Sequence, residues 1–463
     1  MTILITGGTG YIGQALIRSL LNQNHRVTVL TRSVSKARAI LGELPELIEW
    51  DTTTGPPPES AYETVDAVIN LAGRDIAGNR WTEAEKALLY SSRVTTTKHV
   101  LAGAIKAGIK TLITASAIGY YDHRLAGDLS SESPPAGPDT PDFMSHLCQA
   151  WEAASEPPDE LKTSMRRVII RLGVVIGHDS RALLQMSRPI QWGLGASIGP
   201  GDQWMNWVHL DDVVSLFITA LTNKTYTGVY NAVSPGNTQN KPFFKTLGRL
   251  LKRPVWAKIP SVLLHTALGE MATVLTRGQK VVPDRLDAGL FRYRDLNKAL
   301  KDSLGIIAPN NTPRRCDRLL VRQYIPRNRH EIFLFFSDAR NLERITPNFL
   351  RFKIASQSTP VIQKDTVFEY KLRVRGIPIR WVSHICVWNP ESEFVDNQIK
   401  GPYAAWYHTH RFFEYQNGTI IEDEVYYAMP AIPLIASIIR PFIKRDVHSI
   451  FRHRQQVIAQ LFR

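Results

Sequence analysis

A glycine-rich turn at the start of the chain limits what its first domain can be. The short apolar run Ile3–Thr6 passes directly into a turn that opens a helical stretch. Glycines spaced three apart allow a tight turn, close approach of the backbone to a phosphate and close packing of helix on strand. The helix N-terminus offers free N–H groups to an anion. The motif predicts a dinucleotide site with these contact residues: Gly7, Thr9, Gly10, Tyr11, Ile12 and Gly13.

The pattern after this turn indicates an α/β fold. Short β-branched runs alternate with helical stretches through about residue 175, which is typical of a parallel sheet covered by helices. The expected strands are Ile3–Thr6, Arg26–Thr31, Leu47–Asp51, Ala67–Leu71, Thr111–Ala115 and Val168–Leu172. The expected helices span residues 11–23, 83–107 and 143–155. We therefore predict a doubly wound parallel sheet, the Rossmann fold, followed by a small substrate subdomain.

The end of the second strand favours NADP(H) over NAD(H). NAD-binding proteins usually place an acidic residue there for the ribose 2′-hydroxyl, and this chain has Thr31, followed by Arg32 and Ser33. Arg32 can hold a 2′-phosphate in bidentate fashion, and Ser33 can add a hydrogen bond. An exposed basic loop without a ligand is the alternative. Asp51 is a candidate for the adenine amino group, and Asn70, Leu71, Ala72 and Gly73 would line the ribose side.

Several further motifs carry a resemblance to a known family. They are Asn70-Leu71-Ala72-Gly73, Arg80-Trp81, Ser92-Arg93, Ser116-Ala117-Ile118-Gly119-Tyr120-Tyr121, Arg171-Leu172-Gly173, Gln203–His209 and Asn231–Pro235. Over residues 1–303 the chain resembles the extended short-chain dehydrogenase/reductase superfamily, and within it the epimerase-like proteins sometimes labelled cell-division inhibitors. The resemblance implies an NADP(H)-dependent oxidoreductase or epimerase-like enzyme acting on a small molecule. It adds Arg93, Ala115, Leu172 and Gly173 to the cofactor site, and Arg93 could instead form a structural salt bridge.

The sequence departs from this superfamily at the catalytic pair. The superfamily uses Tyr-x-x-x-Lys on one helix, and here Met144 and Cys148 stand at those positions. Neither side chain can shuttle a proton as that tyrosine does. We therefore name Ser116, Tyr120 and Tyr121 as catalytic candidates, with simple packing of the two tyrosines as the alternative.

Two residues of a later loop are candidates for substrate contact. By the resemblance, Trp207 and His209 face the substrate cleft. Asp211 and Asp212 follow His209 and would make an acid/base relay, or they could cap the next helix.

The last third of the chain has a different character. At 463 residues the chain is too long for one core, and we expect an enzyme domain over 1–305, a linker over 306–315 and a second domain over 316–463. Alternating strands are expected at 361–375, 379–389, 403–415 and 418–428, and a closing helix at 434–462. The segments Tyr324-Ile325-Pro326, Asn341–Pro347 and Gly401-Pro402-Tyr403 resemble the START-like or polyketide-cyclase superfamily. That resemblance implies an α+β helix-grip domain around a lipophilic or aromatic ligand.

Aromatic side chains could line this cavity or pack in its core: Trp381, Trp388, Trp406, Tyr407 and Phe412. His408 and His410 share one strand face, and His384 is the nearest third histidine, but paired strand histidines usually pack, so we expect no metal. The apolar stretch Ala428–Ile443 is expected to pack as a lid, with contact to a membrane surface as the alternative.

Composition bounds the remaining possibilities. Only three cysteines occur, no apolar run is long enough to span a membrane, and the glycine motif leaves no room for a leader, so we expect a cytoplasmic protein. The net charge is +14, but nucleic-acid signatures are missing, and we expect no nucleic-acid partner. Nothing in the sequence predicts the oligomeric state. A non-catalytic NADP(H) sensor or scaffold that regulates a protein partner, for example in cell division, stays open beside the enzyme.

Overall fold

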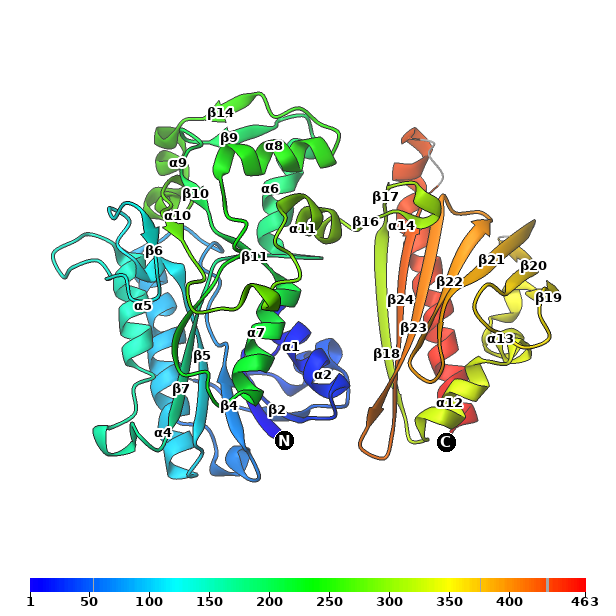
Figure 1. The fold of residues 1–463 in the computed structure, drawn as a ribbon, viewed down its shortest axis with the longest axis horizontal. Helices are drawn as coiled ribbons and strands as arrows, with labels where there is room; N and C mark the ends of the chain where they lie inside the picture. The colour runs from blue at the N-terminus through cyan, green and yellow to red at the C-terminus, as the bar shows by residue number, and fades with distance from the viewer. Residues whose placement is uncertain (53, 375, 430–432) are drawn as a thin grey trace. The chain divides into compact units, whose positions relative to one another are not determined.

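The computed structural model describes residues 1–52, 54–374, 376–429 and 433–463, and for 433–439 only the backbone. The chain forms two compact units. The first comprises Met1–Leu21 and His25–Ser303, and the second comprises Asn22–Asn24 and Leu304–Arg463. Each unit has its own sheet (Figure 1).

The first unit is built on a seven-stranded parallel sheet. Its strands, in spatial order, are β12 (Gly228–Ala232), β7 (Arg166–Leu172), β5 (Thr111–Ala117), β4 (Ala67–Asn70), β1 (Thr2–Thr6), β2 (Arg26–Thr31) and β3 (Glu46–Glu49). The predicted doubly wound parallel sheet is confirmed. The direction of the strand order reverses between β1 and β4, and ligands bind at such a switch point in folds of this kind.

Helices cover both faces of this sheet. The helices α4 (Thr96–Lys106) and α5 (Phe143–Ala153) lie on one face, and α1 (Tyr11–Asn22), α2 (Val34–Leu41) and α7 (Leu210–Thr222) lie on the other (Figure 1). They pack there because each presents apolar residues at helical spacing. In α1 those residues are Ala15, Leu16, Ile17, Leu20 and Leu21.

The helix predicted over 83–107 is not continuous. It consists of α3 (Glu83–Tyr90), a π-helical turn (Ser91–Thr95) and α4. A π turn adds one residue to the winding and often occurs at functional positions. Arg93 lies in the middle of this turn.

The remaining elements of the first unit form a smaller layer beside the sheet. Its helices are α6 (Arg181–Gln191), α8 (Asn240–Leu250), α9 (Ser261–Leu268), α10 (Thr273–Thr276) and α11 (Leu296–Ser303). Short strand pairs join them: β8 (Val174–Ile176) with β11 (Trp207–His209), β9 (Ala196–Ile198) with β14 (Ala257–Ile259), β10 (Trp204–Met205) with β13 (Thr238–Gln239), and β6 (Asp128–Leu129) with β15 (Lys280–Val281).

The second unit is an antiparallel sheet with a long final helix. The strand order is β18 (Asp317–Ile325), β24 (Gly418–Ala428), β23 (Ala405–Tyr415), β22 (Glu393–Lys400), β21 (Ile377–Asn389), β20 (Val367–Val374) and β19 (Lys353–Gln357). Helices α12 (Arg329–Phe336) and α13 (Ala339–Ile345) follow β18, and α14 (Pro433–Leu461) closes the chain. Val447 and Phe451 of α14 pack with Leu319, Val425 and Tyr427 of the sheet. This agrees with the predicted sheet and final helix and is consistent with a helix-grip fold.

The segment predicted as a linker is ordered. Residues 306–315 form a hairpin of β16 (Ile306–Ile307) and β17 (Arg314–Arg315) within the second unit. Ile307 packs against Cys316, Ala405 and Ala428. The Pro, Asn and Thr residues that suggested a flexible connection form the hairpin's turn.

The described helices include none that is long and apolar enough to cross a membrane. The proposed lid or membrane-contacting stretch falls on Ala428–Ile443, of which 430–432 and the side chains through 439 lie outside the described residues.

Candidate functional site: a cofactor cradle at the switch point

The glycine turn packs directly against the end of β4. A Cβ atom added to Gly7 would lie 2.6 Å from the backbone of Leu71, and one added to Gly13 would lie 2.4 Å from the carbonyl oxygen of Gly7. Gly7 also has a left-handed φ of 69°. A side chain at either position would push the ends of β1 and β4 apart. The turn therefore depends on glycine for its shape, as the sequence predicts.

Hydrogen bonds hold the turn in place. The Gly10 amide donates to the Gly7 carbonyl at 3.0 Å, and the Gln14 amide donates to the Gly10 carbonyl at 2.9 Å. Gln14 Nε2 also donates to the Thr9 carbonyl at 2.8 Å. The Tyr11 hydroxyl donates to the His178 carbonyl at 3.0 Å, which ties the start of α1 to the loop after β8.

Asn70 connects the end of β4 with β1 and with helix α4. Thr6 Oγ1 donates to Asn70 Oδ1 at 2.5 Å, and Asn70 Nδ2 donates to Thr97 Oγ1 at 2.8 Å. The Ala72 amide donates to the same Asn70 oxygen at 3.3 Å. Asn70 is fully buried and so supports the cradle from behind. The sequence analysis expected Asn70 to line the ribose side of the cofactor together with Leu71, Ala72 and Gly73, and that contact stays a prediction.

The end of β2 leaves Arg32 available. Thr31 Oγ1 donates to the Ser33 carbonyl at 3.3 Å, and Ser33 Oγ accepts from the Lys36 amide at 3.4 Å as the N-cap of α2. Arg32 is exposed, and none of the described residues forms a hydrogen bond or ion pair with it. Asp51, the predicted adenine contact, is exposed just after Trp50.

Arg93 brings a half-buried positive charge to the other side of the cradle. Its Nη2 donates to the Arg74 carbonyl at 2.8 Å, and its guanidinium lies 5.1 Å from the Trp151 ring. A Cβ added to Gly73 would lie 3.2 Å from the guanidinium carbon. Burial lowers the pKa of Arg93, and the nearby Asp75 partly offsets this effect.

Met144 and Cys148 occupy the face of α5 that meets the end of β5. A Cβ added to Gly119 would lie 2.9 Å from Met144 Cε and 3.9 Å from Cys148 Sγ. Burial raises the pKa of the Cys148 thiol to about 12, so this position carries no charge near neutral pH. Arg93 is therefore, like Arg171, a cation near Cys148, the position where the superfamily has its lysine.

Two of the three catalytic candidates belong to a buried network. Ser116 Oγ donates to Glu152 Oε1 at 2.6 Å, and Arg171 binds the same carboxylate through Nε and Nη2, each at 2.8 Å. Arg171 Nη1 donates to the Tyr121 hydroxyl at 3.0 Å, which donates to Asn231 Oδ1 at 2.6 Å. Burial raises the pKa of Tyr121.

The third candidate is more accessible. Tyr120 is half-buried, and its ring lies 3.4 Å from the guanidinium of Arg171. Ser116 and Tyr121 are each 1% exposed. The network gives both hydroxyls structural partners, and a catalytic role for any of the three stays a prediction.

The remaining predicted cofactor contacts lie near the sheet's carboxyl edge. Ala115 is buried in β5, and Leu172 ends β7. A Cβ added to Gly173 would lie 2.5 Å from the Asn206 carbonyl oxygen, so glycine is required for close backbone packing.

The two predicted substrate contacts are buried. Trp207 is 0% exposed, and its Nε1 donates to the Gly236 carbonyl at 3.1 Å. His209 is the N-cap of α7: its Nδ1 accepts from the Asp211 amide at 3.2 Å, and its Nε2 lies 3.1 Å from Asp302 Oδ2. The cap of α7 is therefore His209 itself rather than Asp211 or Asp212, which lie in the first turn of the helix. The rings of Trp207 and His209 are both enclosed.

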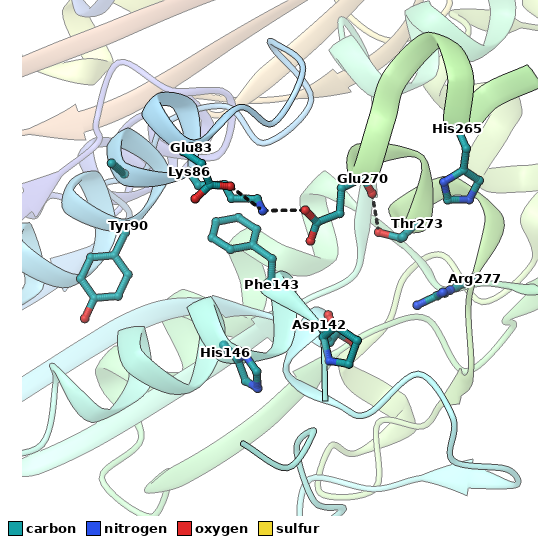
Figure 2. Close-up of a pocket in the computed structure, with 12 residues that line it drawn as sticks. Glu83, Lys86, Tyr90, Asp142, Phe143, His146, His265, Glu270, Thr273 and Arg277 are labelled. Carbon is teal, nitrogen blue, oxygen red and sulfur yellow. Dashed lines mark hydrogen bonds and ion pairs between the residues drawn. The ribbon is translucent and has the colours of Figure 1, made fainter. Parts of the chain in front are cut away.

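An open pocket of about 800 Å³ lies elsewhere on the first unit (Figure 2). In it Lys86 bridges Glu83, at 3.2 Å, and Glu270, at 2.6 Å, next to the Phe143 ring. Its wall also includes Arg277, whose Nη1 lies 2.7 Å from His123 Nε2. No residue that we predicted to contact cofactor or substrate lines this pocket.

In the second unit, the third partner of the paired histidines is an aspartate. His408, His410 and Asp423 bring three potential donor atoms within 4.8 Å of one another. His384 instead pairs with Asp365 at 2.9 Å.

Comparison with known proteins places the first unit in a family. Residues 3–232 match the NAD dependent epimerase/dehydratase family, and residues 259–303 match a domain of unknown function, DUF1731. The Bacillus subtilis epimerase family protein YfhF is 36% identical over 304 residues, which are 65% of this chain and 97% of that protein. The human epimerase family protein SDR39U1 is 34% identical, over 65% of this chain and 99% of that protein. The chain belongs to the epimerase family.

Solved structures agree with this epimerase-family assignment. A crystal structure of human SDR39U1 with NADPH aligns with a TM-score of 0.57 and 34% identity, over 65% of this chain and 99% of that one. A nucleoside-diphosphate sugar epimerase from Corynebacterium glutamicum aligns with a TM-score of 0.52 and 25% identity, over 66% of this chain and 58% of that one.

Proposed function

We propose that this epimerase-family chain is an NADP(H)-dependent oxidoreductase or epimerase-like enzyme acting on a small molecule. Residues 1–305 would hold the cofactor, and residues 316–463 would be a START-like helix-grip domain that binds an apolar ligand. The proposal rests on the cradle at the switch point, which is formed by Gly7, Gly13 and the backbone of Leu71. Unpaired Arg32 lies at the end of the neighbouring strand β2.

The cofactor preference follows from the charge at the end of β2. A carboxylate at Thr31 would repel a 2′-phosphate, whereas the free guanidinium of Arg32 suits one. The solved relative SDR39U1 was crystallised with NADPH, and this supports the same cofactor here. When bound, the cofactor would supply hydride transfer, while the chain positions it and places a fixed positive charge, Arg93, beside Gly73.

Arg93 is proposed to replace the missing lysine in electrostatics. It is a half-buried cation beside the uncharged Cys148, and it is held by the Arg74 carbonyl and the Trp151 ring. An arginine in this position stays charged but cannot pass on a proton. Proton transfer would then require another group, and half-buried Tyr120 is the most accessible of the three candidates.

Titration of the purified protein with NADPH and NADH tests the cofactor assignment. Arg32→Ala should weaken NADPH binding about 10-fold or more, since a charge-assisted hydrogen bond contributes about 1.5–3 kcal/mol, and should leave NADH binding unchanged. Thr31→Asp combined with Arg32→Ala should reverse the preference. Arg38→Ala is the matched control, because Arg38 lies on α2, the helix that follows Arg32, and pairs with Glu43. Equal loss in both arginine variants would contradict the assignment.

A non-catalytic NADP(H) sensor or scaffold is the second candidate. It is favoured by the loss of the Tyr–Lys pair and by the structural engagement of Ser116 and Tyr121. A screen of NADPH oxidation over carbonyl compounds separates the two candidates. Turnover that Tyr120→Phe abolishes, with NADPH binding intact, would favour the enzyme. Tight NADPH binding without turnover on any compound would favour the sensor.

The role of the second unit rests on its architecture. A seven-stranded antiparallel sheet packs against one long helix, and Phe333, Phe336, Phe394 and Phe412 gather in the core between them. Such aromatic interiors suit apolar ligands.

A further inference from the structure

A small cavity inside the second unit has an apolar wall and an ionisable floor. It has a volume of about 70 Å³, and its lining includes Asp338 and Asn341 at the junction of α12 and α13. Its wall is formed by Phe336, Ile345, Ile362, Phe368, Ile385 and Phe394. Asp396, His408, His410 and Arg454 also line it, from three elements of the fold. Four ionisable side chains in so apolar a space require a physical reason.

Strand register brings these polar groups together. Asp396 of β22 lies opposite His408 of β23, and His410 lies opposite Asp423 of β24. Asp423 Oδ1 lies 3.0 Å from His408 Nε2 and 2.8 Å from His410 Nδ1, so one carboxylate oxygen holds both rings. Arg454 of α14 reaches the same cluster, with its Nη2 3.5 Å from His410 Nδ1.

Two atoms of the floor have no partner. Asp396 Oδ1 and Arg454 Nε are both enclosed, and neither forms a hydrogen bond with any described residue. The Arg454 side chain is 8% exposed and faces the cavity. Leaving such a group unsatisfied costs about 1–3 kcal/mol, and more for a charged group. The two atoms therefore call for a molecule in the cavity that can bind them.

The charges of the floor indicate what that molecule offers. Arg454 Nε can only donate a hydrogen bond. Burial raises the pKa of Asp396, although His408 and Arg454 act against this, and in its protonated form this group can donate as well. Asp423 behaves in the opposite way: burial would raise its pKa, but Arg454 and the histidines hold it well below its usual range. Two free donors in one apolar cavity fit an acceptor oxygen.

A metal ion fits the same cluster less well. His408, His410 and Asp423 could supply three ligands, as in 2-His-1-carboxylate sites. However, the Arg454 guanidinium lies 3.5 Å from the nitrogen of His410 that would bind the metal. Two cations this close repel strongly in a buried site. The ionised Asp423 and Arg454 already balance each other without a metal.

We propose that this cavity binds an apolar molecule through an acyl oxygen, a carboxylate or ketone oxygen held by Arg454 and Asp396. The inference rests on the proposed ligand-binding role of the second unit and names the chemical class of its ligand. The volume exceeds the ~10–15 Å³ that one water needs but is far below the ~300 Å³ of a typical drug-sized site. It therefore holds the acyl end, and the apolar remainder extends beyond the cavity past Asp338 and Asn341.

Calorimetric titration of the full chain with three probes tests the proposal. Hexanoate carries a carboxylate, 2-octanone carries a neutral ketone, and toluene carries no oxygen. Hexanoate or 2-octanone should bind, and toluene should bind at least 10-fold more weakly. Arg454→Met should weaken binding of the oxygenated probe about 10-fold or more. Arg452→Met is the matched control, because Arg452 lies on the same helix but is exposed. The better of the two oxygenated probes identifies the acyl class.

Asp396→Asn provides a test if the arginine variant fails to fold. An asparagine amide donates at every pH, whereas Asp396 donates only when it is protonated. Binding of 2-octanone, which does not itself ionise, should therefore weaken with rising pH in the wild-type chain and stay constant in the variant. The same pH response in both chains would overturn the role of Asp396.

Other outcomes separate this inference from the broader proposal. Toluene binding as well as the oxygenated probes would leave an apolar site and overturn the acyl assignment. No binding of any probe would overturn both. One equivalent of zinc or iron in the purified protein, lost in His408→Ala, would replace the acyl site with a metal site. NADPH titration of the same preparations reports on the first unit independently.

Discussion

Arg171 connects most of the buried polar groups around the end of β5. It forms a bidentate ion pair with Glu152, donates to Tyr121 and stacks on Tyr120. Burial would lower the pKa of Arg171, but the Glu152 carboxylate more than offsets this and raises it. A buried pair of this kind is costly to break, because the remaining charge has no partner.

Arg171→Met should therefore lower the free energy of unfolding by about 3–5 kcal/mol, because it leaves the Glu152 carboxylate buried and unpaired. Urea unfolding followed by tryptophan fluorescence measures this. Lys280→Met is the control, since the Lys280–Asp128 pair is partly exposed and should contribute no more than about 1 kcal/mol. A loss in Arg171→Met as small as in the control would show that the network carries little stability.

This network also shows what the sequence could not reveal about the site. Ser116 and Glu152 are 36 positions apart, and Tyr121 and Asn231 are 110 apart. Their pairing depends on how strands and helices assemble, which no local motif encodes. A serine near the position expected from the superfamily and two adjacent tyrosines suggested catalysis, whereas the hydroxyls of Ser116 and Tyr121 have buried partners. The pairing of Asp423 with the two histidines was likewise not predicted from the sequence. Three consecutive acidic residues inside a strand, Glu422–Glu424, were nevertheless a visible signal.

The glycine turn is where local sequence determined the site well. Its predicted shape follows from contacts within a few residues and from one neighbouring strand. Arg26–Thr31 and Gly418–Ala428 were likewise predicted with the bounds that the structure has. In contrast, β22 was not predicted. Its sequence, Glu393–Lys400, mixes apolar and polar residues on both faces, and one face of the strand contributes both to the apolar core and to the polar floor of the cavity.

Adding one methyl group at Gly13 tests whether this turn binds the cofactor. Gly13→Ala would place Cβ 2.4 Å from the Gly7 carbonyl oxygen, and both partners are backbone, so the turn must shift. NADPH affinity should fall about 10-fold or more, and the melting temperature of the first unit should fall with it. Gly137→Ala is the control, because its added Cβ meets no atom within 4 Å. Calorimetry and NADPH titration give both readouts. Unchanged NADPH affinity in Gly13→Ala would mean that the cofactor binds elsewhere.

At the scale of the whole molecule, the two compact units differ in their response to acid. Burial lowers the pKa of His410 in the second unit to about 3. The groups around it are His408, Asp423 and Arg454. A histidine in the unfolded chain has a pKa near 6.5, whereas His410 in the folded unit stays neutral down to about pH 3. The stability that neutral His410 contributes is therefore present above pH 6.5 and is lost as the pH falls toward 3.

The second unit should accordingly lose stability between pH 6.5 and 4, with a contribution from His410 of up to about 1.4 kcal/mol per pH unit. Scanning calorimetry at several pH values should show one transition moving more than the other. His410→Phe should reduce that shift, and His330→Phe should not, because His330 is exposed and paired with Glu391. Identical pH profiles in wild type and His410→Phe would contradict this origin of the effect.

The π turn at Ser91–Thr95 has a consequence for how the family's active site could change over evolution. One extra residue in the winding offsets every side chain before it by roughly 100° from those after it. Deleting one residue in this turn would restore a regular helix, but Arg93 and the N-terminal half of the helix could no longer both keep their present neighbours. A chain that lost its lysine and came to rely on this arginine would then be unable to remove the extra residue in a single step. The extra residue in the π turn would then be retained, together with the altered charge arrangement, in proteins that descend from such a chain.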